Sequence, residues 1–200
     1  MNQEVVNLLK EKNKYSYLIE LLKLGDIDEK LINTVELFTV GNYQHYLKYQ
    51  QDYIELDTEL IEKLIKLTII SICNDHENSQ LNLSSPEFKS YGLPEELDKF
   101  VIDLIFNGVV NVKIDQVNNC WIINESSSRD VYNSRIYNLK VLNEDDIKTR
   151  SVNYAVLNLK NWVNDRLIPL KLQFDEYETK DKDNEKDKDN TRKRKTPDNT

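Results

Sequence analysis

The chain has 200 residues, 31% of them charged and 39% hydrophobic, which is typical of one globular domain with some unstructured chain. Its formal net charge of -8 argues against a general affinity for nucleic acid or anionic membranes, because both repel an acidic surface. The first residues lack a long apolar stretch, and no later run approaches the roughly 18 apolar residues of a membrane span. We therefore expect a soluble, intracellular protein.

Residues 1–74 have the hydrophobic spacing of helices. Helical runs are predicted for 3–24, 29–40 and 43–51, and the second run ends at Gly41-Asn42, which tolerate the left-handed conformation of helix ends. A fourth helix is predicted after Asp57, a plausible N-cap. Its second half is apolar on every side, which places it at the centre of a bundle of antiparallel helices.

Residues 75–131 change to short elements with different periods. A strand is expected at 81–83, and a short helix capped by Ser84 or Ser85 starts with Pro86 and ends at Gly92. Pro94 is expected to open a longer helix. Two strands, 112–115 and 120–123, joined by an asparagine-rich turn at 116–119, predict a hairpin. This order of elements is that of a winged helix.

The C-terminal third is expected to have three parts. Residues 132–151 mix polar and apolar positions without a sustained period, and we interpret them as a linker with some order. Residues 152–174 resume a helix that Pro169 kinks or ends. Residues 175–200 are densely charged with one large apolar side chain, so we expect a disordered tail.

Catalytic, metal and cofactor chemistry have no candidate residues in this sequence. The histidines, His45 and His76, have no second histidine near them, so capping or surface roles are favoured over metal ligation. The four glycines are isolated, which excludes a glycine-rich phosphate loop. Cys73 and Cys120 lie in apolar runs, where a thiol behaves as a small buried hydrophobe with a raised pKa.

The winged helix has the wrong charge for reading a DNA groove. Residues 94–111 carry a net charge of -3, whereas a groove-binding helix needs Lys and Arg to neutralise phosphates. Ile102 and Phe106 project away from the apolar face of this helix, which suits either a protein surface or cover by the domain's own preceding helices. A basic cluster, residues 192–195, is the remaining argument for nucleic acid, and such clusters more often serve nuclear import or solubility.

Two separate segments resemble one family. Residues 97–131 resemble the winged-helix end of the PCI domain in the subunit 7 family of the COP9 signalosome, a family that also includes an initiation-factor-three subunit. The resemblance is carried by Ile114-Asp115-Gln116 in the turn and by Arg129-Asp130-Val131 at the end. Upstream, residues 38–47 (FTVGNYQHYL) resemble the family's Phe-x-x-Gly-x-Tyr-x-x-Tyr-Leu segment. The segment 132–150 and Pro169 depart from the family pattern.

The resemblance implies a mainly α fold: a right-handed stack of antiparallel helical repeats, then a winged helix, a C-terminal helix and a tail. It implies a non-catalytic scaffold subunit, in cytoplasm and nucleus, of the complex that removes Nedd8 from cullins and so regulates cullin-RING ubiquitin ligases. The metalloprotease site of that complex, which needs a His-x-His pair, belongs to another subunit, and this chain lacks the pair.

Partners are therefore expected to be other subunits, contacted through winged-helix edges and a C-terminal helical bundle, with no cofactor, no membrane and no specific nucleic acid. Unpaired strand edges can accept a strand from a neighbour, and the expected interface strands are residues 112–115 and 121–124. The residues expected at interfaces are Ile102, Phe106, Val112, Ile114, Trp121, Ile123, Leu159, Trp162 and Val163. A PCI subunit of the proteasome lid or of translation initiation factor three, and a nucleic-acid-binding winged helix, are the alternative interpretations.

Overall fold

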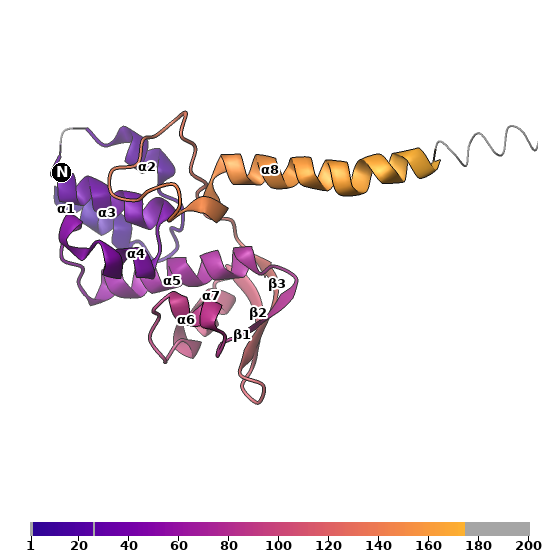
Figure 1. Cartoon of the computed structure of the whole chain (residues 1–200). Helices are drawn as coiled ribbons and strands as arrows, with labels where there is room; N and C mark the ends of the chain where they lie inside the picture. Colours follow the sequence, from indigo (N-terminus) through magenta and orange to yellow (C-terminus); the bar gives the residue numbers. More distant parts are fainter. Residues whose placement is uncertain (1, 26, 175–200) are drawn as a thin grey trace, which may run out of the picture. The chain divides into compact units, whose positions relative to one another are not determined.

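In the computed structural model, residues 2–25 and 27–174 are described, and the chain divides into two units at Val152 (Figure 1). The tail at 175–200, predicted to be disordered, lies outside the described residues, as does the basic cluster at 192–195. The helices of the first unit are α1 (Asn2–Lys10), α2 (Leu18–Lys23), α3 (Glu29–Val40), α4 (Tyr43–Lys48), α5 (Thr58–Asp75), α6 (Pro86–Ser90) and α7 (Asp98–Phe106). Its strands are β1 (Ser79–Asn82), β2 (Val110–Asp115) and β3 (Cys120–Ser126), and single 3-10 turns lie at Gln50–Asp52 and Lys148–Arg150.

Helix α5 is the centre of the first unit, as its all-round apolar pattern predicts. Its N-terminal half, with Leu60 and Leu64, packs in one core with α1 to α3. Its C-terminal half, with Ile69 and Ile72, packs in a second core with the winged helix. Figure 1 shows α5 between these two groups of elements. Asp57 caps the helix, accepting a hydrogen bond from the Leu60 N–H at 3.0 Å, which confirms the predicted N-cap.

The predicted helix over 3–24 is wrong, because the chain forms α1 and α2 with a break between them. Distant groups satisfy the backbone at this break. The Lys63 ammonium donates to the carbonyls of Glu11 and Lys12, and the Asp130 carboxylate accepts the N–H groups of Tyr17 and Leu18. Burial lowers the pKa of Lys63 to about 8. Local periodicity cannot indicate such a break, since both partners lie far along the chain.

Helix α3 has the predicted bounds, but Gly41 ends it for a different reason from the one expected. Its φ of -83° is open to any residue. A Cβ at Gly41, however, would lie 2.6 Å from Leu37 Cδ1 and 2.7 Å from the Leu37 carbonyl oxygen, so the glycine supplies space. Asn42 then begins α4, accepting from the His45 N–H at 3.0 Å.

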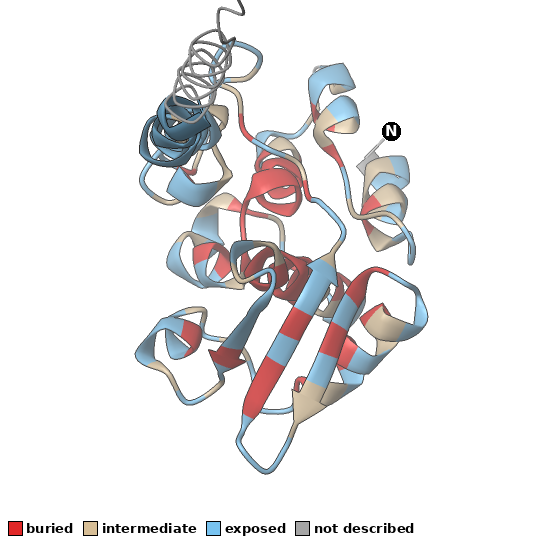
Figure 2. Cartoon of the chain, turned by 90° about the vertical axis from the view of Figure 1, so that its right-hand side faces the viewer, coloured by how far each residue is buried: buried red, intermediate tan, exposed pale blue. Residues whose placement is uncertain are grey.

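The winged helix consists of α6, α7 and an antiparallel sheet with the strand order β1-β3-β2. The hairpin is confirmed, with Asn119 in the left-handed region at a φ of 49°. Figure 2 shows buried and exposed residues alternating along the strands, as expected for a sheet covered on one face. Ser85 caps α6, which confirms that prediction. The prediction that Pro94 opens α7 is wrong: the chain stays non-helical through Glu96, and α7 begins at Asp98 after the buried Leu97.

Arg129, directly after the winged helix, is buried and ties that subdomain to the helices before it. Its Nη2 donates to the carbonyls of Phe38 and Thr39, at 2.6 and 3.0 Å, where α3 ends. Its Nη1 donates to the Gly41 carbonyl at 2.9 Å and to Ser71 Oγ of α5 at 2.8 Å. The carbonyl end of a helix favours a cation, which offsets part of the cost of burying the charge. Burial lowers the pKa of the guanidinium.

Residues 132–150, most of the segment 132–151 expected as a linker with some order, are packed onto the unit in an irregular conformation. Tyr132, Leu142 and Ile147 are buried against Val40 of α3. The fully buried Glu36 carboxylate accepts hydrogen bonds from Tyr137 Oη and from the backbone N–H groups of residues 140–142, at 2.7 to 3.2 Å. A segment whose N–H groups bond to a side chain has no helical or strand period, which explains the weak sequence pattern.

The second unit is the helix α8 (Val152–Trp162), which continues through a π-helical stretch (Val163–Leu167) to residue 174. The helix predicted for residues 152–174 has these bounds, and of the two effects expected of Pro169 the ending is wrong, since residues 168–174 remain helical. Proline has no N–H to donate and crowds the carbonyl four residues earlier. A wider turn just before Pro169 accommodates both effects. The repeat character and handedness predicted for the first helices stay predictions.

Replacing Arg129 with alanine should destabilise the first unit strongly. The substitution leaves several buried carbonyls without a donor, and we expect the free energy of unfolding to fall by about 3 kcal/mol or more. Urea denaturation followed by circular dichroism measures this. Arg135→Ala is the matched control, because Arg135 is exposed and should change stability by less than about 0.5 kcal/mol. A loss for Arg129→Ala no larger than for the control would contradict the structural role of Arg129.

Replacing Glu36 with glutamine should release the 132–150 segment. The amide offers one acceptor oxygen in place of two and turns a donor toward backbone N–H groups. Hydrogen exchange of the amides of residues 140–142 should accelerate by about tenfold or more. Glu144→Gln, an exposed change in the same segment, serves as the control. Unchanged exchange in Glu36→Gln would show that apolar packing alone holds the segment.

Candidate protein-interaction surface

The outer face of α7 exposes large apolar side chains. Phe106 is 86% exposed and Ile102 is 44% exposed, while Phe100, Val101 and Leu104 on the opposite face are buried. The helical-wheel placement of Ile102 and Phe106 is therefore confirmed, and the alternative that preceding helices cover them is wrong. Such residues on an acidic helix are unsuited to phosphates and suited to a protein partner.

Of the two strands expected to offer a free edge, only β2 lies at the edge of the sheet. Strand β3 lies between β1 and β2, so the segment from Trp121 to Asn124 is paired on both sides and has no free edge. Its prediction as an interface strand is wrong, because the sequence gives no sign that the distant β1 pairs with it. Strand β2, which contains the other predicted segment, is at the edge of the sheet. Its unpaired backbone groups can receive a strand.

Three predicted interface side chains belong to the core instead. Val112, Trp121 and Ile123 are buried on the covered face of the sheet. Trp121 packs edge-on against Phe88 of α6, with ring centroids 5.4 Å apart. Ile114 is half-buried and packs against the same core. Since β-strands alternate, residues at every second position share one face, and that face is here turned inward.

A shallow groove of about 630 Å³ lies between α7 and the hairpin turn. Ile102 and Ile114 form its apolar part together with Val117, which is 94% exposed. Gln116 Nε2 donates to the Asp98 carboxylate at 3.1 Å and links the turn to the first turn of α7. The groove lies at the C-terminal end of β2, where Ile114 and Asp115 line it, so a strand added to β2 would meet apolar side chains at that end as well as free backbone groups.

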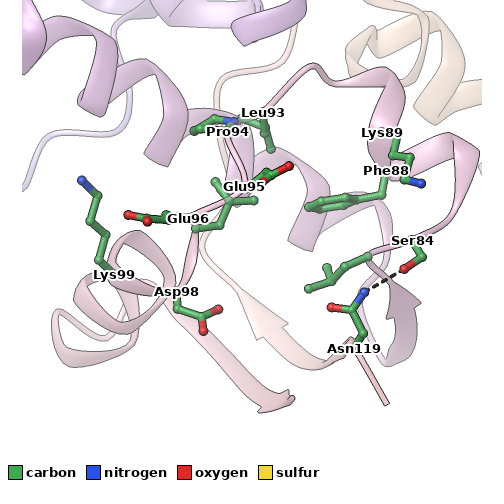
Figure 3. Close-up of a pocket in the computed structure, with 12 residues that line it drawn as sticks. Ser84, Phe88, Lys89, Leu93, Pro94, Glu95, Glu96, Asp98, Lys99 and Asn119 are labelled. Carbon is green, nitrogen blue, oxygen red and sulfur yellow. Dashed lines mark hydrogen bonds between the residues drawn. The ribbon is translucent and has the colours of Figure 1, made fainter. Parts of the chain in front are cut away.

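A larger hollow of about 840 Å³ lies on the other side of Asp98, between α6, the α6–α7 loop and the hairpin turn (Figure 3). Its floor is apolar, and its rim carries charged side chains from the loop and both helices. Ser84 and Asn119 are joined by a hydrogen bond of 2.7 Å at one end. The sequence does not indicate this hollow, since a helix opened by Pro94 would hold Glu95 and Glu96 in its first turn, whereas both lie in the loop before α7. The residues that line it are Leu83, Ser84, Phe88, Lys89, Leu93, Pro94, Glu95, Glu96, Leu97, Asp98, Lys99 and Asn119.

In the second unit, the predicted bundle residues are available at the surface. Leu159 is exposed, Trp162 is 54% exposed, and Val163 is half-buried. None of the residues of α8 is buried. Further exposed apolar side chains continue to residue 174, among them Leu167, Leu170 and Phe174. A helix with this much exposed apolar surface suits association with other helices.

The histidines and thiols have structural surroundings. His45 Nδ1 accepts the Asn42 N–H at 3.2 Å, completing a reciprocal cap of α4, and burial lowers its pKa to about 4. His76 lies 3.5 Å from a carboxylate oxygen of Glu87. Burial raises the pKa of the Cys73 thiol to about 12. Within residues 2–25 and 27–174, no cluster of three or more acidic, histidine or cysteine side chains is placed to hold a metal, and no helix is long and apolar enough to cross a membrane.

Comparison with known families identifies the domain that carries these surfaces. Residues 40–125 match the family model of the PCI domain. The match runs from the last residue of α3 to the penultimate residue of β3 and so covers α4, α5 and the winged helix. The predicted PCI resemblance is confirmed, and the chain contains a PCI domain. PCI domains mediate assembly with other subunits of multiprotein complexes.

The buried His45 should make stability depend on pH. Its pKa in the folded state, about 4, lies below the ordinary 6.5, so the unfolded state binds the proton more readily. This contribution is complete above about pH 6.5 and is lost as the pH falls toward 4. Between pH 7 and 5 it amounts to at most about 2 kcal/mol.

His45→Gln tests this, because glutamine can keep the cap without titrating. Urea denaturation at pH 7 and 5 should show a smaller fall in unfolding free energy for His45→Gln than for the unmodified chain. His76→Gln should leave the difference between the two pH values unchanged. Parallel pH profiles for all three proteins would contradict the assignment to His45.

Proposed function

With the PCI domain as premise, we propose that this chain is a non-catalytic scaffold subunit of the COP9 signalosome, related to subunit 7. The observation that carries the proposal is the pair of motifs at 38–47 and 97–131, which lie in register with the family and which the PCI match largely spans. The Arg-Asp pair of the second motif clamps the winged helix onto the helices before it. Arg129 and Asp130, which carry part of the resemblance, therefore fix how the winged helix packs on the preceding helices.

The scaffold would use two surfaces. In the first unit, the free edge of β2 and the apolar groove beside it can take a strand or loop from a neighbouring subunit. In the second unit, the exposed apolar residues around Trp162 can enter a bundle with C-terminal helices of other subunits. Association would cover the exposed apolar side chains of both surfaces and would pair the free backbone groups of β2.

Its part in the chemistry would be indirect. The chain would support removal of Nedd8 from cullins, and so regulation of cullin-RING ubiquitin ligases, by holding the subunit that carries the protease site. Among the described side chains, the buried His45 and Cys73 have pKa values unsuited to catalysis near neutral pH, which agrees with a scaffold. We place the protein in cytoplasm and nucleus, in line with the resemblance.

Two alternatives remain, of which the first is also a scaffold subunit and the second is a nucleic-acid-binding protein. A PCI subunit of the proteasome lid or of translation initiation factor three would have the same fold with other neighbours. A nucleic-acid-binding winged helix would have to rely on residues 192–195, because residues 94–111 carry a net charge of -3. Binding of duplex DNA at physiological salt that disappears on deleting residues 190–200 would support that last alternative.

Purification of the tagged chain from its own cells, followed by mass spectrometry, tests the assignment. We expect the other signalosome subunits in comparable amounts, and Nedd8-cullin conjugates should accumulate when the chain is depleted. Recovery of proteasome-lid or initiation-factor subunits in their place would contradict the assignment while leaving the PCI scaffold role intact.

Trp162→Ala should weaken assembly without unfolding the chain. Trp162 is half-exposed, so its removal costs little in the free protein and removes an aromatic anchor from the assembled state. The amount of co-purified subunits should fall by about tenfold, a change of about 1.4 kcal/mol. Asn164→Ala, an exposed polar change on the same helix, is the control. Unchanged recovery with Trp162→Ala would exclude this anchor, and a loss of helical signal would make Trp162 a folding residue.

A further inference from the structure

The hollow between α6, the α6–α7 loop and the hairpin turn has the features of a peptide pocket. We propose that it binds an extended partner segment that inserts one large apolar side chain and sets an adjacent Lys or Arg against Glu95 and Glu96. The inference rests on the proposed scaffold function and names the chemistry of one partner. It concerns other residues than those of the free edge of β2 and the exposed apolar residues of α8.

The floor of the pocket supplies the apolar contact. Phe88 and Leu97 are almost fully buried at the base, while Leu83 and Leu93 are half-buried at its sides. Phe88 is fixed edge-on against Trp121, so the floor is rigid before a partner arrives. A volume of about 840 Å³ is ample for one aromatic or branched side chain with its flanking backbone. An anchor in a preformed hollow gains affinity because little ordering is needed on binding.

The rim selects the charge of the partner. Glu95 and Glu96 are exposed, and within the described part of the chain their carboxylates have no hydrogen bond or ion pair. Neighbouring acids on α7 are already bound: Asp98 accepts from Gln116, and Asp103 pairs with Lys66 at 2.7 Å. Figure 3 shows the Glu95 carboxylate directed toward the Phe88 side of the pocket and the Glu96 carboxylate toward Lys99. Glu95 is therefore the nearer partner for a Lys or Arg whose apolar stem lies on the floor, and Glu96 adds negative charge at the rim.

The opposite rim gives the segment a direction. Lys89, on α6, is exposed and stands across the pocket from the α6–α7 loop (Figure 3). Lys99, on the loop side, is directed to Glu62 at 3.5 Å and lies over the Phe100 ring at 4.6 Å. A bound segment therefore meets negative charge at one side and a single ammonium at the other. Its basic residue should face the loop, and a carbonyl or carboxylate should face Lys89.

The chain's own tail fits this chemistry only in part. Residues 192–195 carry four basic side chains, but residues 190–200 contain no large apolar side chain to fill the floor. A second protein that pairs an apolar anchor with a basic neighbour satisfies both requirements. Residues 190–200 thus serve as a natural control that has the charge without the anchor.

Fluorescence anisotropy of labelled peptides on the full-length chain tests the proposal. The probe is Gly-Ser-Lys-Trp-Lys-Ser-Gly, and the comparison peptides replace both Lys with Glu, replace Trp with Ser, or reproduce residues 190–200. We expect the probe to bind at least about tenfold more tightly than each comparison peptide at low salt, since both charge and anchor contribute.

Two kinds of variant locate the binding. The double charge reversal Glu95→Lys and Glu96→Lys should weaken the probe by about tenfold or more, whereas Glu55→Lys, an exposed reversal before α5, should not. Ser84→Trp should also weaken the probe, by filling the hollow from its exposed rim. Circular dichroism verifies that each variant folds.

Three results would overturn the proposal: equal binding of all peptides, probe binding that neither kind of variant changes, or tail binding as tight as that of the probe. The last result would make the tail the occupant. The assay uses the isolated chain, so its failure leaves the proposed function untouched. Conversely, recovery of other complexes in the purification experiment would refute the signalosome assignment without affecting peptide binding.

Discussion

The buried guanidinium of Arg129 is the interaction on which the arrangement of the first unit depends. It donates to carbonyl oxygens at the end of α3, in the turn into α4 and in the middle of α5. The neighbouring Asp130 does the reverse, accepting the first N–H groups of α2. Two adjacent residues thus join the end of the winged helix to three helices and to the break between α1 and α2.

This clamp explains how an acidic winged helix becomes a protein-binding module. The covered face of the sheet and the inner face of α7 pack against α5. The outer face of α7, the edge of β2 and the hollow beside α6 remain exposed. Those surfaces combine apolar side chains with negative charge. Such a combination repels phosphates and favours apolar, basic partners. The proposed function uses the faces that remain exposed.

Local signals were sufficient for the features that depend on neighbouring residues. The bounds of α3, the Asp57 and Ser85 caps and the hairpin turn all follow from short-range chemistry, and the PCI resemblance followed from two motifs. The features that sequence reasoning missed depend on distant partners. The break before α2 needs Asp130, and the packed 132–150 segment needs Glu36. The central place of β3 needs β1, some forty residues earlier. No local sequence pattern indicates these long-range pairings. Trp121 and Ile123 were therefore predicted at an interface, whereas both are buried in the core.

The central claim is that the helices before α5 and the winged helix form one cooperative unit because the Arg129 clamp joins them. Native-state hydrogen exchange across a series of low denaturant concentrations tests it most directly. The account predicts that amides in α3 and in β3 open with the same free energy and the same dependence on denaturant. Opening of β3 at a clearly lower free energy, while α3 stays protected, would contradict it and would make the winged helix an independently folding module.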